Sequence, residues 1–370
     1  MSTELNIREK QVKIGISTGG GDCPGLNSVI RAIVRSGITQ HGYEFWGIKD
    51  SFNGMMKKPY QVWPLDIEKT TGILHRGGTI LGTTNAGNPF SIKKDNPNAE
   101  TGNDVSQSIV DAYRELGLDC IIVIGGDGTQ GIAYQLAELG INIIGVPKTI
   151  DNDLAATDQT TGFDTAVGIA ADALDRLQTT AESHERIMIL EVMGRNAGHI
   201  ALHAGLASGA HGILLPEIPF SYDSVIKKIK ERQKRNKNFS VIVVAEGAYP
   251  KGGKEVFQEI AGKKNLGGVG HLLADELYKK TKIDTRVTVL GHIQRGGTPS
   301  HVDRILGTAY GVKAVELVHA KKFGKIVTYR QGEMKEVDYK EIAGRYRPVA
   351  SDDLYLQTAR AIGVCLGDED

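Results

Sequence analysis

Two acidic side chains lie one residue apart in the stretch GVPKTIDNDL, which covers residues 145–154. Asp151 and Asp153 follow an apolar run typical of a buried strand, and Lys148 lies just before them. One carboxylate can serve as a general base toward a hydroxyl group, and the other can bind a divalent cation. In an extended segment the two side chains should not point the same way. As an alternative, both acids cap the helix expected after Gly162 or stabilise a turn.

Two glycine-rich stretches follow other strand-like runs and suit phosphate groups. The first, STGGGDCPGLN from Ser17, ends in a helical pattern, and the second, VIGGDGTQG from Val123, holds Asp127 among its glycines. Glycine lets the backbone approach a ligand, and a helix N-terminus presents free N–H groups to an anion. A purely structural turn is the alternative for the first stretch. The first stretch is not a Walker loop, because no Gly-Lys-Ser/Thr follows. We expect Asp127 to hold Mg²⁺ against the phosphates.

Cationic side chains gather near two further strand-like runs. Arg186 precedes and Arg195 follows the first run, while Arg286 precedes and His292 and Arg295 follow the second. Guanidinium groups make bidentate contacts with phosphate, so we expect a substrate phosphate here. Each arginine alone could instead form a surface ion pair. His292 could instead be a structural histidine, and Met193 could instead fill a gap in the hydrophobic core.

The composition indicates a globular cytoplasmic protein. The chain has 370 residues, with 44 basic and 44 acidic side chains, so no general attraction to nucleic acid or membrane is expected. Its cysteines, Cys23, Cys120 and Cys365, are too scattered for a disulfide framework or a zinc site. The N-terminal residues lack the apolar core of a signal peptide. The chain is long enough for two domains.

Short apolar runs alternate with helical patterns along the chain, which predicts an α/β fold with parallel sheets. The expected strands cover residues 12–17, 43–48, 120–126, 141–147, 186–192, 241–247 and 286–291. A helix is expected over residues 106–117, a polar loop over 91–106 and a frayed acidic tail at the end, LGDED. In such folds ligands bind at the carboxyl ends of the strands, which is where the glycine loops and acids lie.

Eight motifs together resemble one family. GGDCPGLN, RGGT, GGDGT, PKTIDND, SHER, EVMGR, AEGA and LGHIQRGG occur in the order and at about the spacing of the 6-phosphofructokinases, over about residues 11–320. The resemblance implies two Rossmann-like three-layer domains with mainly parallel sheets and an active site in the cleft between them. The expected donor domain covers 1–160 plus about 292–345, the substrate domain about 161–291, and a C-terminal extension 346–370.

The resemblance also implies the reaction and its residues. ATP, with Mg²⁺, phosphorylates the 1-hydroxyl of D-fructose 6-phosphate in glycolysis, and Asp151 is the base. The other catalytic residues are Thr149, Arg76 and Arg195. Donor contacts are Gly21, Arg76, Gly77, Gly126, Asp127, Gly128 and Thr129, and the metal ligands are Asp127 and Asp153. Substrate contacts are Thr149, Ile150, Asp151, Arg186, Met193, Gly194, Arg195, Glu246, Arg286, His292, Ile293, Gln294 and Arg295. Relatives contribute the arginines matching Arg186 and Arg286 from a neighbouring subunit, so a homotetramer or dimer is expected.

The resemblance leaves open the phosphoryl donor, the regulation, the overall function and the acceptor. Lys148 is typical of pyrophosphate-using relatives, whereas Gly128 is the form of ATP-using ones, and a solvated loop lysine is a further alternative for Lys148. Arg31 and Arg35 are similar to effector-site arginines, but Ile67 and Gln178 stand where others are expected, which argues against control by ADP and phosphoenolpyruvate. The rival functions are a pyrophosphate-dependent enzyme, a non-catalytic regulatory subunit and an NAD kinase. Sedoheptulose 7-phosphate is an alternative acceptor.

Overall fold

The structure is a computed structural model of the chain and describes residues 11–92, 103–260, 262–342 and 344–369. Its contacts divide into two compact units. Unit 1 contains Met1–Thr149, Leu154–Gly162 and Gly296–Arg345; unit 2 contains Ile150–Asp153, Phe163–Arg295 and Tyr346–Asp370. The C-terminal residues that the motifs set apart as an extension therefore cluster with unit 2. Most of the expected polar loop, residues 93–102, lies outside the described residues.

Unit 1 is built on a mainly parallel sheet. Its strand order is β13-β12-β5-β4-β1-β2-β3, and only the two edge pairs, β2 with β3 and β12 with β13, are antiparallel among the described residues. The strands are β1 (Lys13–Thr18), β2 (Glu44–Ile48), β3 (Val62–Leu65), β4 (Cys120–Gly125), β5 (Ile143–Pro147), β12 (Lys325–Arg330) and β13 (Glu333–Asp338). Every residue of β4 and β5 is buried, as expected for strands covered on both faces.

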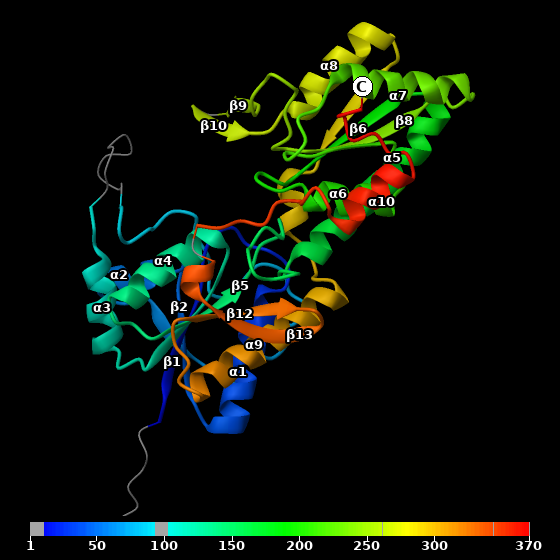
Figure 1. Cartoon of the computed structure of the whole chain (residues 1–370). Coiled ribbons are helices and arrows are strands. Elements are labelled where there is room, and N and C mark those ends of the chain that lie inside the picture. The colour runs from blue at the N-terminus through cyan, green and yellow to red at the C-terminus, as the bar shows by residue number, and fades with distance from the viewer. Residues whose placement is uncertain (1–10, 93–102, 261, 343, 370) are drawn as a thin grey trace, which may run out of the picture. The chain divides into compact units, whose positions relative to one another are not determined.

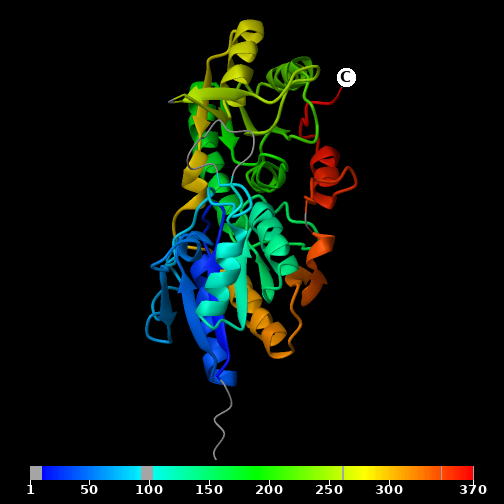
Figure 2. The same ribbon diagram turned by 90° about the vertical axis from the view of Figure 1, so that its left-hand side faces the viewer.

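Helices cover both faces of this sheet. On one face α1 (Leu26–His41) packs against α9 (His301–His319), and the two lie side by side in both views, blue and orange (Figures 1 and 2). Their close approach depends on Gly311, where a Cβ would lie 2.7 Å from the Cβ of Ala32. The other face carries α2 (Asn53–Met56), α3 (Ser106–Glu115) and α4 (Asp127–Glu138), over a core that includes Phe52, Ile109 and Leu136.

Unit 2 is a second three-layer α/β unit. Its sheet runs β11-β6-β8-β7 and is parallel throughout. The strands are β6 (Ile187–Val192), β7 (Gly212–Leu214), β8 (Ser240–Ala245) and β11 (Thr285–Val289), with a separate hairpin of β9 (Phe257–Ile260) and β10 (Lys263–Leu266). One face packs on α5 (Phe163–His184) and α6 (His199–Ala207); α7 (Tyr222–Lys234) and α8 (Val269–Thr281) pack on the other, and α10 (Leu354–Ala361) lies against α6 (Figure 1). The fold class predicted from the sequence is confirmed.

The end of the chain differs from the prediction of a frayed tail. Leu366 and Gly367 are buried, and the segment extends the sheet through a parallel bridge between Cys365 and Gly212. The Ser221 N–H donates to the Gly367 carbonyl at 2.7 Å. The acidic residues of LGDED favoured a solvent-exposed tail, but burial of the apolar Leu366 and these backbone bonds hold the segment in place. Of the described helices, none has the length and apolar character needed to cross a bilayer.

Candidate active site

The two glycine loops of unit 1 meet around Thr129. A Cβ at Gly19 would lie 2.6 Å from the Thr129 Cγ2, and a Cβ at Gly125 would lie 2.4 Å from the Thr129 Cβ. Thr129 is buried, and the Gly19 N–H donates to the Ile124 carbonyl at 3.0 Å. These two glycines are therefore required by packing, which brings the loops after β1 and β4 together at the carboxyl edge of the sheet.

Lys148 contacts both glycine loops. Its side chain is only 3% exposed, and its Nζ donates a hydrogen bond to the Gly21 carbonyl. Its backbone N–H donates to the Gly125 carbonyl at 3.0 Å. The alternative that Lys148 is a solvated loop lysine is therefore wrong: burial and this bond fix its ammonium beside the first glycine loop.

A buried asparagine positions the RGGT loop. Asn27, 1% exposed, donates from Nδ2 to the Arg76 carbonyl at 3.0 Å and accepts the Ile80 N–H at 2.9 Å. Gly77 has no room for a side chain, because a Cβ would lie 2.2 Å from the Gly297 carbonyl oxygen. The side chain of Arg76 itself is exposed. Sequence reasoning missed Asn27, although a polar residue within the apolar helix LNSVIRAIV is a signal that could have found it.

Asp127 and Gly128 begin α4 at the end of β4. Partial burial raises the pKa of the Asp127 carboxyl, and a hydrogen bond from the Gly344 backbone opposes that rise. Gly128 differs from the packed glycines of these loops, since nothing lies within 4 Å of the position of its Cβ and its φ is not in the left-handed region. Neither packing nor backbone conformation requires glycine at this position.

In unit 2 the motifs EVMGR and AEGA meet beside Arg295. Burial, together with the charges of Asp151 and Glu191, raises the pKa of Glu246 to about 7, although Arg295 opposes the rise. The Gly247 N–H donates to the Gly194 carbonyl at 3.1 Å. A carboxyl with this pKa is partly protonated near neutral pH, so Glu246 can either donate or accept a hydrogen bond.

The turn after β6 depends on glycine and on Gln294. Gly194 has φ +135°, a conformation that favours glycine, and a Cβ at Gly247 would lie 2.0 Å from the Arg195 carbonyl oxygen. The Met193 N–H donates to the Oε1 of Gln294 at 2.8 Å, and Gln294 is fully buried. Gln294 thus positions the Met193 backbone, while its neighbours His292 and Ile293 are exposed and Arg295 is partly exposed.

The acidic segment is not extended, contrary to the prediction. Asn152 has φ +53° and is buried, so the chain turns between Asp151 and Asp153. Arg347 holds this turn: its N–H donates to the Asp153 carbonyl at 2.6 Å and its Nη2 to the Asn152 carbonyl at 2.9 Å. Sequence reasoning missed Arg347, because no motif near it points to a partner 195 residues away.

The alternative interpretation was that Asp151 and Asp153 cap the helix after Gly162. In the structure a different carboxylate, that of Asp303, is bonded at this position. The Gly162 N–H, just before α5, donates to Oδ1 of Asp303 at 2.8 Å. Asp303 is fully buried. This carboxylate, from the first turn of α9, therefore serves the helix start, and the capping interpretation is not needed to explain Asp151 and Asp153.

Arg186 and Arg286 lie apart from the other substrate residues. Both form ion pairs with Asp284, and the Arg186 Nε to Asp284 Oδ2 distance is 2.7 Å. Arg186 precedes β6 and Arg195 follows it, so about five strand steps, roughly 17 Å, separate them. Arg286 likewise lies in β11, at the amino end from which the strand leads to His292. Arg186 and Arg286 therefore lie at the amino ends of these strands, and Arg195 and His292 follow their carboxyl ends.

Glu191 is a further buried group that sequence reasoning left without a role. It is 2% exposed, and its two carboxylate oxygens accept the Gly268 and Gly270 N–H groups, each at 2.8 Å. The glutamate therefore anchors the start of α8, and its charge acts on Glu246. Its motif EVMGR was noted, but the pairing with a glycine turn far along the chain has no local signal.

No cluster of three or more potential metal-binding side chains occurs among His, Cys, Asp and Glu of the described residues. A cage made only of protein ligands is therefore not indicated there. Mg²⁺ bound together with nucleotide phosphates needs only one or two carboxylates. Asp127, at the start of a helix beside a glycine loop, fits such a role.

The motifs and their arrangement match one protein family over most of the chain. A family model described as Phosphofructokinase matches residues 13–318. The chain belongs to the phosphofructokinase family. The likeness extends to ATP-dependent 6-phosphofructokinase 1 of Synechocystis sp., 47% identical over 360 residues, covering 96% of this chain and 99% of that protein. The pyrophosphate–fructose 6-phosphate 1-phosphotransferase of Streptomyces coelicolor is 48% identical over 343 residues, covering 91% of this chain and 96% of that protein.

Solved phosphofructokinase structures share the fold. The phosphofructokinase of Pichia pastoris, in a structure described as the T-state, superposes with a TM-score of 0.78 at 28% identity. The match covers 90% of this chain and 36% of that longer one, so this chain spans about a third of it. The family and the α/β fold predicted from the sequence are both confirmed.

Proposed function

We propose that this phosphofructokinase transfers the terminal phosphoryl group of ATP to the 1-hydroxyl of D-fructose 6-phosphate, giving fructose 1,6-bisphosphate and ADP. Relatives named ATP-dependent 6-phosphofructokinases support this, the first of them at 47% identity over 96% of the chain. Because a pyrophosphate-dependent relative is 48% identical, overall identity does not choose the donor. The choice depends on individual residues.

The open space at Gly128 is the observation that most supports ATP as the donor. Its Cβ position is open, so the protein itself would accept a side chain there. Glycine within a helix is less favourable than alanine by about 0.8–1 kcal/mol, so keeping it without a packing reason points to a ligand. An aspartate at this position would place a negative charge where the α-phosphate and ribose of ATP must pass, at a cost of several kcal/mol.

Lys148 does not oppose this choice. Its ammonium is buried beside Gly21, where a positive charge favours any polyphosphate donor. ATP and pyrophosphate both present such charges, so Lys148 does not discriminate between them. We assign Gly21, Arg76, Gly77, Gly126, Asp127, Gly128 and Thr129 to the donor, with Thr129 packing the loops together.

The acceptor residues of unit 2 divide the chemistry between a base and a set of binding groups. Asp151 takes the proton of the 1-hydroxyl while the hydroxyl oxygen attacks the terminal phosphorus and ADP leaves. Glu246, next to Asp151 and Arg295, hydrogen-bonds a sugar hydroxyl, and Met193 and Gly194 line the sugar with Ile150. His292 and Arg295 bind the 6-phosphate, and Thr149 and Arg195 help to orient the acceptor.

Mg²⁺ is the cofactor that these residues fit. We propose Asp127 as a protein ligand of the ion. That Asp153 is a second ligand stays a prediction. When bound, the ion would neutralise charge on the phosphoryl oxygens. Arg76 and Arg195 add positive charge of their own.

A homo-oligomer explains the positions of Arg186 and Arg286. Since both lie at the opposite end of their strands from Arg195 and His292, we propose that they bind the 6-phosphate of a neighbouring subunit, as part of a tetramer or a dimer. Asp284 holds both guanidinium groups and orients them. We place the enzyme in the cytoplasm, as expected for glycolysis.

An acceptor assay on the purified protein alone tests the proposal. With ATP and Mg²⁺, fructose 6-phosphate should be phosphorylated at far higher kcat/KM than NAD, and sedoheptulose 7-phosphate serves as a third acceptor. Activity without any partner excludes a regulatory subunit, and preference for fructose 6-phosphate excludes an NAD kinase. No turnover with fructose 6-phosphate, or faster turnover with either other acceptor, would contradict the proposal.

A further inference from the structure

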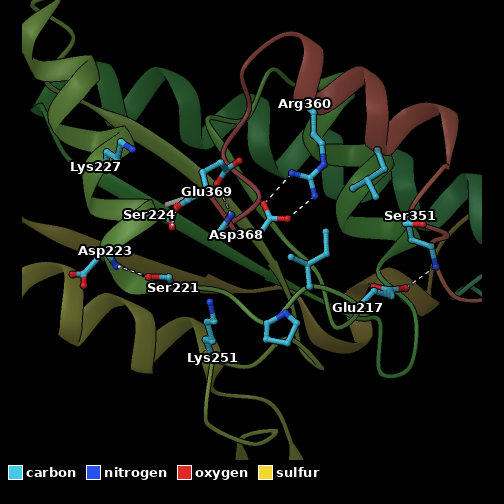
Figure 3. A pocket seen from close by; sticks show the side chains of 15 residues that line it. Glu217, Ser221, Asp223, Ser224, Lys227, Lys251, Ser351, Arg360, Asp368 and Glu369 are labelled. Atoms are coloured by element: carbon cyan, nitrogen blue, oxygen red, sulfur yellow. Dashed lines mark hydrogen bonds and ion pairs between the residues drawn. The ribbon is translucent and has the colours of Figure 1, made fainter.

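Unit 2 contains a hollow that none of the proposed acceptor residues lines. Its volume is about 780 Å³, within the range of roughly 300–1,000 Å³ typical of small-molecule pockets. The loop after β7, the start of α7 and the C-terminal segment form its walls (Figure 3). Glu217, Ser221, Lys251, Ser351 and Arg360 are among the side chains that face it.

The carboxylates of this hollow are already engaged. Glu217 accepts two backbone N–H groups, Asp223 pairs with Lys280 at 2.8 Å, and Asp368 accepts Arg360 through two bonds at 2.9 and 2.5 Å. Glu369 accepts the Leu366 and Gly367 N–H groups at 3.0 and 3.1 Å. A cationic ligand would therefore have to compete with bonds that the protein already makes.

Lys251 differs from these groups. Within the described residues no hydrogen bond or ion pair engages its ammonium, and Figure 3 shows the side chain pointing into the hollow. Ile218, Val349 and Leu356 add apolar surface to the lining of the same hollow. This combination suits a ligand that carries an anionic group on an apolar body.

The walls of the hollow connect directly to the acceptor residues. Glu217 accepts the Gly198 N–H at 3.0 Å and the Val349 N–H at 2.7 Å. Gly198 is the N-cap of α6 and lies three residues after Arg195. Burial raises the pKa of Glu217, and these amide bonds oppose the rise. A shift of the Glu217 side chain would therefore move the turn that carries Arg195.

A second connection runs along the backbone from Val349. Two residues earlier, Arg347 holds the Asn152 and Asp153 carbonyls. The Arg347 carbonyl in turn lies 3.1 Å from the Nε2 of His199, in the first turn of α6. The segment 347–349 thus bridges the hollow and the turn next to Asp151.

We propose that this hollow is a second ligand site, for an organic anion with an apolar body, and that its occupation changes the affinity for the sugar phosphate through Glu217 and the segment 347–349. By linkage, the sugar phosphate changes the affinity for that anion by the same factor. The binding part of the proposal does not depend on the catalytic assignment, because it can be measured without turnover.

Phenyl phosphate is a suitable probe, since it joins an apolar ring to an anionic group. Calorimetric titration into the protein saturated with fructose 6-phosphate should show one saturable site per chain. Inorganic phosphate, which lacks the ring, and benzyl alcohol, which lacks the charge, should bind more weakly. Lys251→Met should lower the affinity for phenyl phosphate by about three- to fivefold, which corresponds to the loss of one exposed ion pair. Ser351→Trp should abolish binding, because the larger side chain fills the hollow.

Lys254→Met is the matched control, because Lys254 is exposed three residues from Lys251 and does not line the hollow. It should leave binding unchanged. Absence of saturable binding, or binding that survives both Lys251→Met and Ser351→Trp, would overturn the proposed site. Binding that appears only without fructose 6-phosphate would place the probe at the acceptor site and would overturn it as well.

The coupling is tested by the KM for fructose 6-phosphate with and without phenyl phosphate. The wild type should show a shift in KM, and Glu217→Gln, which alters the bonds to Gly198 and Val349, should bind the probe but show a smaller shift. Lys254→Met should retain the full shift. An unchanged KM in the wild type at saturating phenyl phosphate would overturn the regulatory part of the proposal.

Discussion

At the scale of single residues, the account assigns unlike roles to two neighbouring carboxyl groups. Burial and the charges of Asp151 and Glu191 raise the pKa of Glu246, which favours its neutral form. The assigned base, Asp151, must be ionised to accept a proton. The pair therefore resembles other acid–base sites in which one carboxyl is ionised and the other is held partly neutral.

Replacing the base tests this assignment. Asp151→Ser should lower kcat by about 10²- to 10⁴-fold, while the KM for fructose 6-phosphate changes little because Glu246 and Arg295 remain. Steady-state kinetics give both values. Asp172→Ser, at an exposed position of α5, is the control and should behave as the wild type. Near-normal turnover of Asp151→Ser would refute the role of Asp151 as base.

Glu246 should make both stability and binding depend on pH. Its pKa rises from 4.5 to about 7 on folding, so the folded state binds the proton more tightly, and the free energy of unfolding falls as pH increases from about 4.5 to 7. Above that range Glu246→Gln should be more stable than the wild type, by about 2–3 kcal/mol at most. Denaturant unfolding at several pH values measures the difference, which should vanish near pH 4.5.

The same titration should affect substrate binding. As Glu246 ionises above pH 7, the KM for fructose 6-phosphate should rise, because a charged carboxylate can no longer donate a hydrogen bond. Glu246→Gln should lose this part of the pH dependence and keep the part due to the substrate phosphate itself, which titrates near pH 6. Identical pH profiles for the two proteins would show that Glu246 does not titrate in this range.

At the scale of elements, α4 offers a comparison between two glycines. Gly128 and Gly131 both lie in this helix with nothing within 4 Å of the Cβ position. Gly128→Ala and Gly131→Ala should each stabilise the protein by about 0.4–1 kcal/mol. Only Gly128→Ala should also raise the KM for ATP. Equal effects of the two substitutions on the KM for ATP would contradict the claim that glycine at position 128 makes room for ATP.

The elements also show why sequence reasoning succeeds for some strands and fails for others. Strands such as β4 and β6 are continuous apolar runs because helices cover both faces of the sheet, and all seven expected strands are present. The edge strand β13, EMKEVD, is mostly polar, and β7 is only three residues long, so neither shows this signal. The hairpin of β9 and β10 is likewise polar and was missed.

Sequence reasoning could single out candidate site residues where they form local motifs, and their roles stay predictions. The two glycine loops lie together in unit 1, and the motifs EVMGR and AEGA lie together in unit 2, while PKTIDND is divided between the units. Glu191 and Arg347 act through partners distant in the sequence, so no local pattern identifies them. Asn27 also acts through a distant partner, and its only local signal is that it is polar within an apolar helix. The positive φ of Asn152 was also missed, and its carbonyl accepts a hydrogen bond from Arg347, which is far along the chain.

At the scale of the whole molecule, the assignment of Arg186 and Arg286 requires an assembly. Mixing two inactive variants, Asp151→Ser and Arg286→Ala, should restore activity, since one subunit keeps the base and its neighbour supplies the arginine. Random pairing in a symmetric dimer should restore about a quarter of the wild-type activity. The unmixed variants serve as controls. No recovery after subunit exchange, verified by mass, would show that Arg286 acts within its own chain or not at all.

A comparison of phosphoryl donors shows whether the protein phosphorylates fructose 6-phosphate with ATP. The purified protein is assayed with fructose 6-phosphate, Mg²⁺ and either ATP or pyrophosphate, in parallel with Gly128→Asp and the control Gly131→Asp. The account predicts a higher kcat/KM with ATP for the wild type and for Gly131→Asp, and a selective loss of ATP use in Gly128→Asp. A higher kcat/KM with pyrophosphate for the wild type would contradict it.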